Sequence, residues 1–590
     1  MKHLAILLTA LALLLALTPA CAPGGDDPID GADAPFPGGK ADGGIDAASP
    51  EARAVLSLVN DPLVDLAELD IDAALNKRAA ENIIDHRNGA DGTVGTADDD
   101  AFDSLDELDA VKYVGPYALQ QLLDYAIAQG YLDAEAQRSV DVIFSPQPYD
   151  NSHSARVATL IDSAKQSIDI AMYSYSDARI ASALQRAVDR GVKIRFIFDT
   201  ASADRKLTGT ALDNSKSGHL EQMGINVRWV NKIMHHKFMI VDGPRDDVAN
   251  IDTATVVAGS GNWSNGAATR YDENTLFFTG YRELTMRMQR EFNRMWAHSR
   301  DVVIDASLPY ELSTVRMDAV GIPDEASTHA WFTSANFSVT GDTFRINGND
   351  TVSTALANAI RGATKSIHIA SGHLRSRPIS EALMEVARTK PWVDIKILLD
   401  GQEYISDYYQ QQQQQDVDDC LAAATTDSQH RHCLDSGFYF SYEVSELEHI
   451  PLRFKYYSYR WDYHYAVQMH HKYIIIDGDE LHTGSYNFSD NAEHNTFDDT
   501  LTFEGAEFAN LVGAYEANFA RIWDQGRADG LYDQLMAELP TVNPVPIVFP
   551  PMALTWSEVT DLKRAIRDAC PDVNSDDYRT NPQNHWVCYK

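Results

Sequence analysis

The sequence HHKFMIVD at residues 235–242 is followed by GSGN at residues 259–262, and this combination decides the fold. Nearly the same combination returns as HHKYIIID at residues 470–477 with GSYN at residues 484–487. In each copy a His is followed two residues later by a Lys, and the Lys is followed five residues later by an Asp. Two copies with the same internal order indicate a duplicated functional unit rather than a chance match.

The four residues between each Lys and Asp are apolar and β-prone, so both motifs are predicted to lie on strands. Because side chains alternate faces along a strand, His235 and Lys237 share one face. His470 and Lys472 do the same in the second copy, and the middle histidines point the other way. Each motif therefore presents an imidazole beside an ammonium group. An imidazole can act as nucleophile or proton donor, and an ammonium can hold a phosphate oxygen.

Polar residues after each motif complete a set that is suited to phosphate chemistry. An acid follows each motif Ser by 13 residues, Glu273 in the first copy and Asp498 in the second. Such an acid can accept a hydrogen bond from one imidazole nitrogen and so fix the tautomer. The Gly-Ser-x-Asn turns add hydroxyl and amide donors with little steric bulk. Those donors belong to Ser260, Asn262, Ser485 and Asn487.

The two motifs resemble the catalytic motifs of the phospholipase D superfamily, and the resemblance covers roughly residues 140–530. It implies a metal-independent reaction in two steps, in which one His attacks phosphorus and forms a covalent phosphohistidine. The other His protonates the leaving oxygen and then activates water. By this analogy we assign His235 as the nucleophile and His470 as the general acid and base, while the reverse order stays open.

The resemblance also implies roles for the remaining motif residues, and it implies no cofactor. Glu273 and Asp498 would orient the histidines, and Asp242 and Asp477 would secure the ends of the motif strands. One His must start neutral and the other protonated, so a bell-shaped pH profile is expected. The residues expected to hold the phosphate oxygens are Lys237, Lys472, Asn262 and Asn487.

A longer repeat surrounds the two motifs. Residues 164–171 match residues 363–370, and each stretch is followed by a helical segment and an apolar strand that ends in Asp. Alternating strands and helices favour an α/β fold. We therefore predict two pseudo-symmetric phospholipase D-like α/β sandwich halves with mixed sheets, packed about a pseudo-twofold axis with the site at their junction. A small N-terminal all-α module is predicted to precede them.

Composition shifts along the chain indicate where its parts begin and end. The second half carries an insertion at residues 403–465, which holds a glutamine run and an aromatic stretch at residues 456–465. That stretch either lines the substrate entrance or forms an ordinary strand pair, and the ordinary pair is favoured. The predicted parts are a signal peptide (1–21), a disordered linker (22–50), a helical module (51–135), half 1 (140–310), half 2 (311–540) and a C-terminal tail (541–590).

The N-terminus is predicted to be a targeting segment. The apolar run at residues 4–17 is too short for a membrane span and fits a signal peptide. Cys21 resembles the lipidated Cys of a bacterial lipoprotein, and an acyl anchor there would tie the protein to a membrane surface. Ordinary secretion after Ala20 is the alternative. We expect an exported protein, either in the bacterial cell envelope or secreted.

Export outside the reducing cytoplasm favours disulfide bonds between the other four cysteines. We expect bridges Cys420–Cys433 and Cys570–Cys588, although the sequence allows two other pairings. A structural zinc site is disfavoured because no Cys-x-x-Cys occurs.

The predicted helical module contains a segment, Leu105–Tyr125, that resembles a helix-hairpin-helix motif with its hairpin at residues 114–116. In that family the hairpin contacts a DNA phosphate, but here the neighbourhood is acidic, so a structural or protein-contact role is favoured over DNA binding. A preceding acidic loop could hold Ca²⁺ at Asp91, Asp98 and Asp100. A plain solvated loop is favoured, because the spacing is not that of an EF-hand.

The net charge of −37 over 590 residues opposes loose attraction to nucleic acid or anionic lipid. We favour an exported phosphodiesterase of the phospholipase D type, acting on phospholipid head groups as a monomer, because a membrane tether and two motifs in a single chain fit such an enzyme. A nuclease of the same superfamily, with DNA as its partner, is the alternative. A catalytically idle binding protein is disfavoured, because both motifs are intact. The sequence does not determine the head-group preference, or whether the acceptor is water or an alcohol.

Overall fold

The structure is a computed structural model, and it describes residues 45, 49–94, 96, 98–132, 138–303, 307–316, 321–322, 326–435 and 437–589. The predicted signal peptide, the lipidation candidate Cys21 and nearly all of the predicted linker lie outside the described residues. None of the helices in the described part of the chain combines the length and the hydropathy that a membrane crossing needs.

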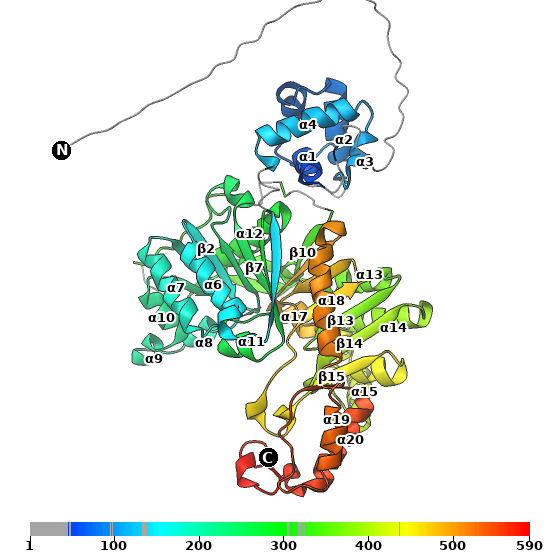
Figure 1. Ribbon diagram of the computed structural model, residues 1–590. Helices are drawn as coiled ribbons and strands as arrows, with labels where there is room; N and C mark the ends of the chain where they lie inside the picture. Colours follow the sequence, from blue (N-terminus) through cyan, green and yellow to red (C-terminus); the bar gives the residue numbers. More distant parts are fainter. Residues whose placement is uncertain are drawn as a thin grey trace, which may run out of the picture. The chain divides into compact units, whose positions relative to one another are not determined.

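Two sheets of eight strands each form the centres of the two halves, and the sheets repeat one design (Figure 1). The first has the order β1-β8-β7-β6-β2-β3-β4-β9, and the second has the order β10-β19-β17-β16-β13-β14-β15-β20. In each sheet three neighbouring strands run parallel, β2-β3-β4 and β13-β14-β15, while the other neighbours pair antiparallel. The predicted α/β fold with two mixed-sheet halves is confirmed.

The strands of the first sheet are β1 (Ser139–Ser145), β2 (Ser167–Met172), β3 (Lys193–Phe198), β4 (Val227–Trp229), β6 (Lys237–Val241), β7 (Thr255–Gly259), β8 (Glu273–Thr279) and β9 (Arg300–Asp301). Those of the second sheet are β10 (Thr328–Phe332), β13 (Ser366–Ser371), β14 (Asp394–Asp400), β15 (Leu452–Tyr456), β16 (Lys472–Ile476), β17 (Glu480–Gly484), β19 (Asp499–Glu504) and β20 (Met552–Leu554). Both motif strands, β6 and β16, are fully buried central strands.

Helices cover both faces of each sheet, and the alternation of side chains along β2 shows why. Ile168 and Ile170 pack into a core with α6 (His153–Ser163) and α7 (Ala178–Asp189), whereas Ala171 faces α12 (Arg282–Ala297). The second half repeats this arrangement with α13 (Thr351–Gly362), α14 (Arg377–Thr389) and α18 (Ala509–Trp523).

The core that contains α12 and α18 is shared between the halves. A single cluster of buried residues joins Ala171 and Phe238 of the first sheet to Ala370 and Tyr473 of the second. Separating the halves would expose this apolar surface to water, so burial favours their association.

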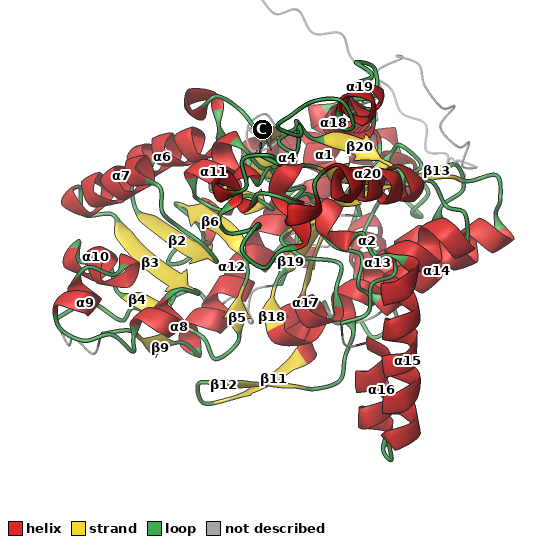
Figure 2. Cartoon of the chain, turned by 90° about the horizontal axis from the view of Figure 1, so that it is seen from below, coloured by secondary structure: helices red, strands yellow, loops and turns green. Residues whose placement is uncertain are grey.

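The predicted insertion at residues 403–465 contains a strand of the core as well as added structure. Strand β15 lies beside β14 as β4 lies beside β3, so Leu452–Tyr456 belongs to the repeated design. The added part includes a helical hairpin, α15 (Asp407–Ala423) and α16 (Asp427–Asp435), which projects from the second half in Figure 2. Cys420 and Cys433 bridge the hairpin, with their Cα atoms 5.6 Å apart.

The C-terminal tail completes the second sheet. Strand β20 pairs antiparallel with β15 and supplies the sheet's last strand. Helix α20 (Trp556–Ala569) follows, and a capping box of Thr555 and Glu558 satisfies its first backbone N–H groups. Cys570 and Cys588 are bridged, with their Cα atoms 5.4 Å apart. Both disulfides join the pairs that the sequence predicted.

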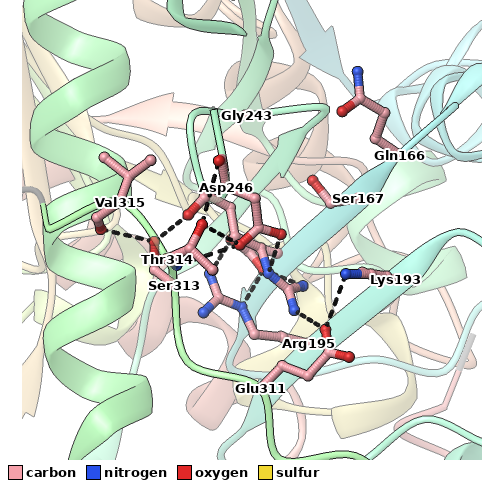
Figure 3. A network of polar contacts seen from close by, with 12 residues as sticks. Gln166, Ser167, Lys193, Arg195, Gly243, Asp246, Glu311, Ser313, Thr314 and Val315 are labelled. Carbon is pink, nitrogen blue, oxygen red and sulfur yellow. Dashed lines mark hydrogen bonds and ion pairs between the residues drawn. The ribbon is translucent and has the colours of Figure 1, made fainter. Parts of the chain in front are cut away.

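The segment that connects the halves is held against the first half by polar contacts, which Figure 3 shows. Arg195 donates to Asp169 through two nitrogens, and both side chains are almost fully buried. The nearby Arg245 lies 2.7 Å from the carboxylate of Glu311 in the connecting segment. A buried arginine needs such a partner, so this ion pair fixes where the connection lies.

The helical module has a hydrophobic core of its own. Its main helices are α1 (Pro50–Asn60), α2 (Lys77–Arg87), α3 (Leu105–Asp109) and α4 (Pro116–Ala128). Gly115 is the N-cap of α4 and Pro116 its first residue, so the predicted hairpin joins α3 to α4. The buried guanidinium of Arg87 donates to the carbonyls of Val59, Asp61 and Val64 and so ties α2 to the end of α1. The exact limits of the predicted parts stay predictions.

Candidate active site

The two motifs meet where the halves join. Strand β5 (Ile233–Met234) of half 1 pairs in parallel with β18 (Thr496–Phe497) of half 2. The backbone N–H of His235 donates to the carbonyl of Phe497 at 3.0 Å, and that of His470 donates to the carbonyl of Asp272 at 3.0 Å. Each motif His is therefore anchored to the backbone of the opposite half.

The acids that orient the histidines are also exchanged between the halves. His235 Nδ1 lies 2.7 Å from Asp498 Oδ1, and His470 Nδ1 lies 2.8 Å from both carboxylate oxygens of Glu273. The sequence predicted these acids as partners of the histidines but did not predict which acid serves which His. In each pair the Nδ1 contact leaves Nε2 available for chemistry.

The two motif lysines are buried beside their histidines. Lys237 Nζ donates to the carbonyl of His235 at 2.5 Å, and Lys472 Nζ donates to the carbonyl of His470 at 2.7 Å. The ring of Tyr173 stands edge-on to the imidazole of His235, with their centroids 4.6 Å apart. These contacts hold the ammonium groups in place at the junction.

The Gly-Ser-x-Asn turns serve two purposes. Ser485 Oγ donates to Asp498 Oδ1 at 2.8 Å and so braces the partner of His235. Ser260 Oγ accepts the backbone N–H of Asn274 at 2.9 Å, next to Glu273. Within the described part of the chain, the amide oxygens of Asn262 and Asn487 have no hydrogen-bond partner. These two oxygens are therefore available to accept a hydrogen bond from a ligand.

The motif aspartates secure the strand ends, in the way that the sequence predicted. Asp242 accepts backbone N–H groups of residues 165–167, and Asp477 accepts those of residues 364–366. Both aspartates have positive φ, 50° and 54° respectively. They tie each motif strand to the start of β2 or β13, and none of these hydrogen bonds involves His235 or His470.

The middle histidines face away from the junction and are fully buried. His236 lies between Asp499 (2.8 Å) and Glu291 (3.3 Å), and hydrogen bonds to these acids overcome burial and raise its pKa to about 9. His471 instead contacts the amides of Asn274 and Asn518, and burial lowers its pKa. The two halves therefore hold a charged and a neutral imidazole at equivalent places. The sequence motifs did not predict the hydrogen-bond partners of His236 and His471.

Comparison with known proteins decides the family. The family described as "Cardiolipin synthase, PLD-like domain" matches residues 157–296 and 356–523, which together make up more than half of the chain. The chain belongs to the phospholipase D superfamily.

Individual relatives cover one part of this phospholipase D-like chain. The mitochondrial cardiolipin hydrolase of Drosophila melanogaster is 33% identical over 155 residues, which are 24% of the chain and 58% of that protein. The human protein of the same name is 30% identical over 151 residues, 25% of the chain and 53% of that protein. The chain thus spans little more than half the length of these relatives.

Two solved structures are similar to parts of the chain. Nuc from Salmonella typhimurium, a phospholipase D family member, is 30% identical, with a TM-score of 0.23, over 28% of the chain and 97% of its own. The phosphatidylserine synthase of Haemophilus influenzae is 11% identical, with a TM-score of 0.42, over 65% of the chain and 86% of its own.

Burial sets the electrostatics of the phospholipase D-like site. Together with the charge of Lys237, it lowers the pKa of His235 to about 4, and it lowers the pKa of His470 well below its ordinary value. Burial also lowers the pKa of Lys237 to about 8 and that of Lys472 to about 7. A bound phosphate anion would favour the charged form of all four groups.

The two partner acids differ in protonation. Burial raises the pKa of Glu273 to about 7, so this carboxyl group holds a proton part of the time at neutral pH. Burial alone would also raise the pKa of Asp498, but His235, Lys237 and a hydrogen bond from Thr496 lower it below its ordinary value. Asp498 is therefore a permanent anion, whereas the Glu273–His470 pair can carry an extra proton.

Sequence reasoning missed two side chains at the junction, Tyr173 and His373. Tyr173 directly follows β2, and His373 lies two residues after the end of β13. Aligning the two repeated strands is the signal that could have found them. His373 lies close enough to His470 for its charge to lower the pKa of that imidazole.

The calcium site that the sequence left as an alternative in the helical module is only partly assembled. Asp98 accepts the N–H of Asp91 and the hydroxyl of Thr96, so its carboxylate is already used within the loop. Among the described residues, the potential metal ligands that converge here are His86, Asp100 and Glu107. Of Asp91, Asp98 and Asp100, only Asp100 belongs to that group, and calcium binding here remains untested.

Proposed function

We propose that the protein hydrolyses phospholipids at the head-group ester, through a covalent phosphohistidine and without a metal ion. Membership of the phospholipase D superfamily supports phosphodiester chemistry, and relatives named as cardiolipin hydrolases support a phospholipid substrate. The observation that carries the mechanism is the pairing of two junction histidines with acids of different protonation, Asp498 and Glu273.

His235 is the nucleophile in this scheme. The ionised Asp498 accepts the Nδ1–H of His235 and so fixes the tautomer with the lone pair on Nε2. Burial and the charge of Lys237 lower the pKa of His235 to about 4 and so keep the imidazole neutral. Nε2 attacks phosphorus and forms a P–N bond, and the bond between phosphorus and the head-group oxygen breaks. The electron pair of that bond stays on the departing oxygen.

His470 supplies the proton that the departing oxygen needs. Glu273, with a pKa of about 7, and His470 can share one extra proton near neutral pH. The bound phosphodiester anion draws this proton onto the imidazole, which then donates it from Nε2. In the second step His470 takes a proton from water, the water oxygen attacks phosphorus, and the P–N bond breaks. This releases the phosphatidic acid and restores His235.

Charge on the non-bridging oxygens is offset by groups already in place. Lys237 and Lys472 are fixed by hydrogen bonds to backbone carbonyls, and the amide nitrogens of Asn262 and Asn487 are the further donors in this scheme. Removing one such preorganised donor typically costs about 3–4 kcal/mol of transition-state stabilisation. Four donors around one phosphate can therefore take over the work of a metal ion.

A paired assay in EDTA tests the substrate. One arm follows head-group release from vesicles of phosphatidylcholine, phosphatidylethanolamine or cardiolipin, and the other follows cleavage of single- and double-stranded DNA. Head-group release without DNA cleavage is expected, and His470→Ala should lower it about 10²–10⁴-fold. DNA cleavage without lipid turnover would establish a nuclease instead. Loss of all activity in EDTA would contradict the metal-free mechanism.

Trapping the intermediate tests the order of the two histidines. With a phosphodiester whose leaving group needs no proton, His470→Asn should still form a phosphohistidine, and His235→Asn should form none. Peptide mapping locates the modified residue. A phosphoenzyme on His470 in the His235→Asn variant would reverse the assignment.

We also propose that the protein is exported and held at a membrane by an acyl group on Cys21. Two disulfides, Cys420–Cys433 and Cys570–Cys588, support an oxidising location. Labelling with radioactive palmitate in a bacterial host should mark the protein but not its Cys21→Ala variant. An unlabelled, freely secreted protein would contradict the anchor.

A further inference from the structure

The two halves differ at equivalent positions beside the catalytic histidines. At the end of β2 the N–H of Tyr173 donates to the carbonyl of His236, and at the end of β13 the N–H of Gly372 donates to that of His471. Tyr173 and Gly372 therefore occupy equivalent positions. The next residues, Ser174 and His373, are equivalent too, so only half 2 places an imidazole here.

A buried carboxylate holds the imidazole of His373. His373 Nδ1 lies 2.9 Å from Oε1 of Glu403, which is completely buried. Glu403 also accepts from Arg375 Nη2 at 2.6 Å and from the backbone N–H of Leu374 at 3.2 Å. The side chain of His373 remains 35% exposed. With Nδ1 turned to Glu403, Nε2 is the ring nitrogen that a ligand can reach.

The imidazole of His373 lies on the His470 side of the junction. Ser371 pairs with Lys472 between β13 and β16, and His373 follows two residues later. Its charge is one of those that lower the pKa of His470. A group attached to phosphorus on this side would therefore pass close to His373.

The local charge favours an anion at this place. Arg375 neutralises Glu403, so a protonated His373 leaves the trio of side chains with a net positive charge. The equivalent place in half 1 offers the ring of Tyr173 and the hydroxyl of Ser174, neither of which is charged at neutral pH. The two sides of the site therefore differ in charge, and an anionic group is favoured on the His373 side.

We propose that His373 binds a second anionic group of the substrate, on the His470 side of the scissile phosphate. This rests on the proposed function: with His470 as the general acid, that side receives the departing head group. The preferred substrates are then phospholipids whose head group carries a phosphate or carboxylate of its own. Glu403 and Arg375 position the imidazole and do not touch the ligand.

Competitive inhibition tests this site without relying on lipid turnover. Hydrolysis of bis(p-nitrophenyl) phosphate is the readout, and glycerol 1-phosphate and glycerol 1,3-bisphosphate are the inhibitors. A hydrogen bond to a charged group corresponds to about a 10- to 100-fold change in affinity, so the wild-type enzyme should bind the bisphosphate more tightly by about that factor. His373→Gln should reduce the preference to about twofold, and Glu403→Gln should reduce it in part.

His368→Gln is the matched control. His368 lies on the same strand, β13, and pairs with Glu516 at 2.8 Å, but it lies five residues before His373, in the half of the strand away from the junction. This variant should keep the wild-type preference. An equal loss in both His variants, no loss in His373→Gln, or no preference in the wild-type enzyme would overturn the proposal.

A lipid arm separates this inference from the proposed function. On mixed micelles, the ratio of turnover of cardiolipin to that of phosphatidylcholine should fall about tenfold in His373→Gln. A wild-type enzyme that prefers the bisphosphate but releases no head group would refute the lipid substrate and leave the anion site standing. Lipid turnover with unchanged ratios would refute the anion site alone.

Discussion

At the scale of single residues, the most informative contrast is between the two acids that orient the histidines. Asp498 is held as an anion by His235, Lys237 and its hydrogen bonds, whereas burial leaves Glu273 with a pKa near 7. Environments that separate the pKa values of two carboxyl groups in this way give the groups different roles in acid–base catalysis. The contrast gives the pseudo-symmetric site a direction.

Removing each acid should move a different limb of the pH profile. Glu273→Gln removes the carboxylate that stabilises the imidazolium of His470, so the alkaline limb should shift to lower pH. Asp498→Asn removes the anion beside His235 and makes this imidazole less basic, so the acidic limb should shift to lower pH. Both should slow turnover about 10²–10⁴-fold. Profiles of kcat/KM for bis(p-nitrophenyl) phosphate measure this, and exchanged limbs would mean exchanged roles.

Asp477→Ala should destabilise the second half without touching the chemistry. Three backbone N–H groups lose their acceptor, and caps of this kind are worth about 0.5–2 kcal/mol. Asp477→Gly should cost less backbone strain, since φ is 54° here. Urea unfolding measures both, with the exposed Asp479→Ala as control.

The hydrogen bonds that Asp477 accepts also predict a pH dependence of stability. Burial would raise the pKa of Asp477, but its hydrogen bonds lower it below the ordinary value of 3.8. The contribution of Asp477 is therefore complete above that pH and is lost as pH falls through the lower, folded-state value. Urea midpoints of wild type and Asp477→Ala should converge in acid, and a constant difference would contradict the account.

At the scale of elements, the close approach of β17 and β19 limits what residue 484 can be. A Cβ on Gly484 would lie 2.2 Å from the carbonyl oxygen of Asp499, which is the residue after Asp498. The strands would have to separate, and overpacking of this kind costs about 1–3 kcal/mol.

Gly484→Ala should therefore lose both stability and activity, because the shift displaces the partner of His235. Gly513→Ala is the control, since its Cβ would meet no atom within 4 Å and it lies inside α18. That variant should gain up to about 1 kcal/mol. Thermal unfolding and turnover of the two variants can be compared directly, and an unaffected Gly484→Ala would contradict the packing argument.

The elements also show how much of the fold can be predicted from the sequence. The repeated strands and both motif strands were predictable, because apolar runs of five or six residues specify buried strands. Strand β20 has only three residues and follows a proline-rich stretch, so no periodicity marks it. The sequence also did not predict that each His pairs with an acid of the opposite half. His235 and Asp498 are 263 positions apart, and only tertiary packing brings them together. His373 belongs to no motif and becomes visible only when the halves are aligned.

At the scale of the whole molecule, the net negative charge opposes binding to an anionic lipid surface. A net charge of −37 repels an anionic vesicle, although the catalytic junction itself is lined by lysines and imidazoles. Salt screens long-range repulsion between exposed charges more than it weakens contacts inside a buried site.

Raising the NaCl concentration from low to physiological values should therefore lower KM for phosphatidylglycerol vesicles. The Debye length shortens from about 30 Å at 0.01 M to about 8 Å at 0.15 M, which is shorter than the distances over which surface charges repel a vesicle. Neutral phosphatidylcholine vesicles in the same series are the control and should show little change. A KM that rises with salt on the anionic vesicles would indicate a basic docking surface.

The exchange of acids between the halves also has a consequence for the chain during its synthesis on the ribosome. His235 and Lys237 emerge from the ribosome long before Asp498 has been translated, so the nascent first half carries the proposed nucleophile before its partner acid exists. His470 arrives later and depends on Glu273 from the part already made. Under the proposed mechanism, a chain built in this way would be inactive during synthesis and would gain its activity only when both halves have folded together.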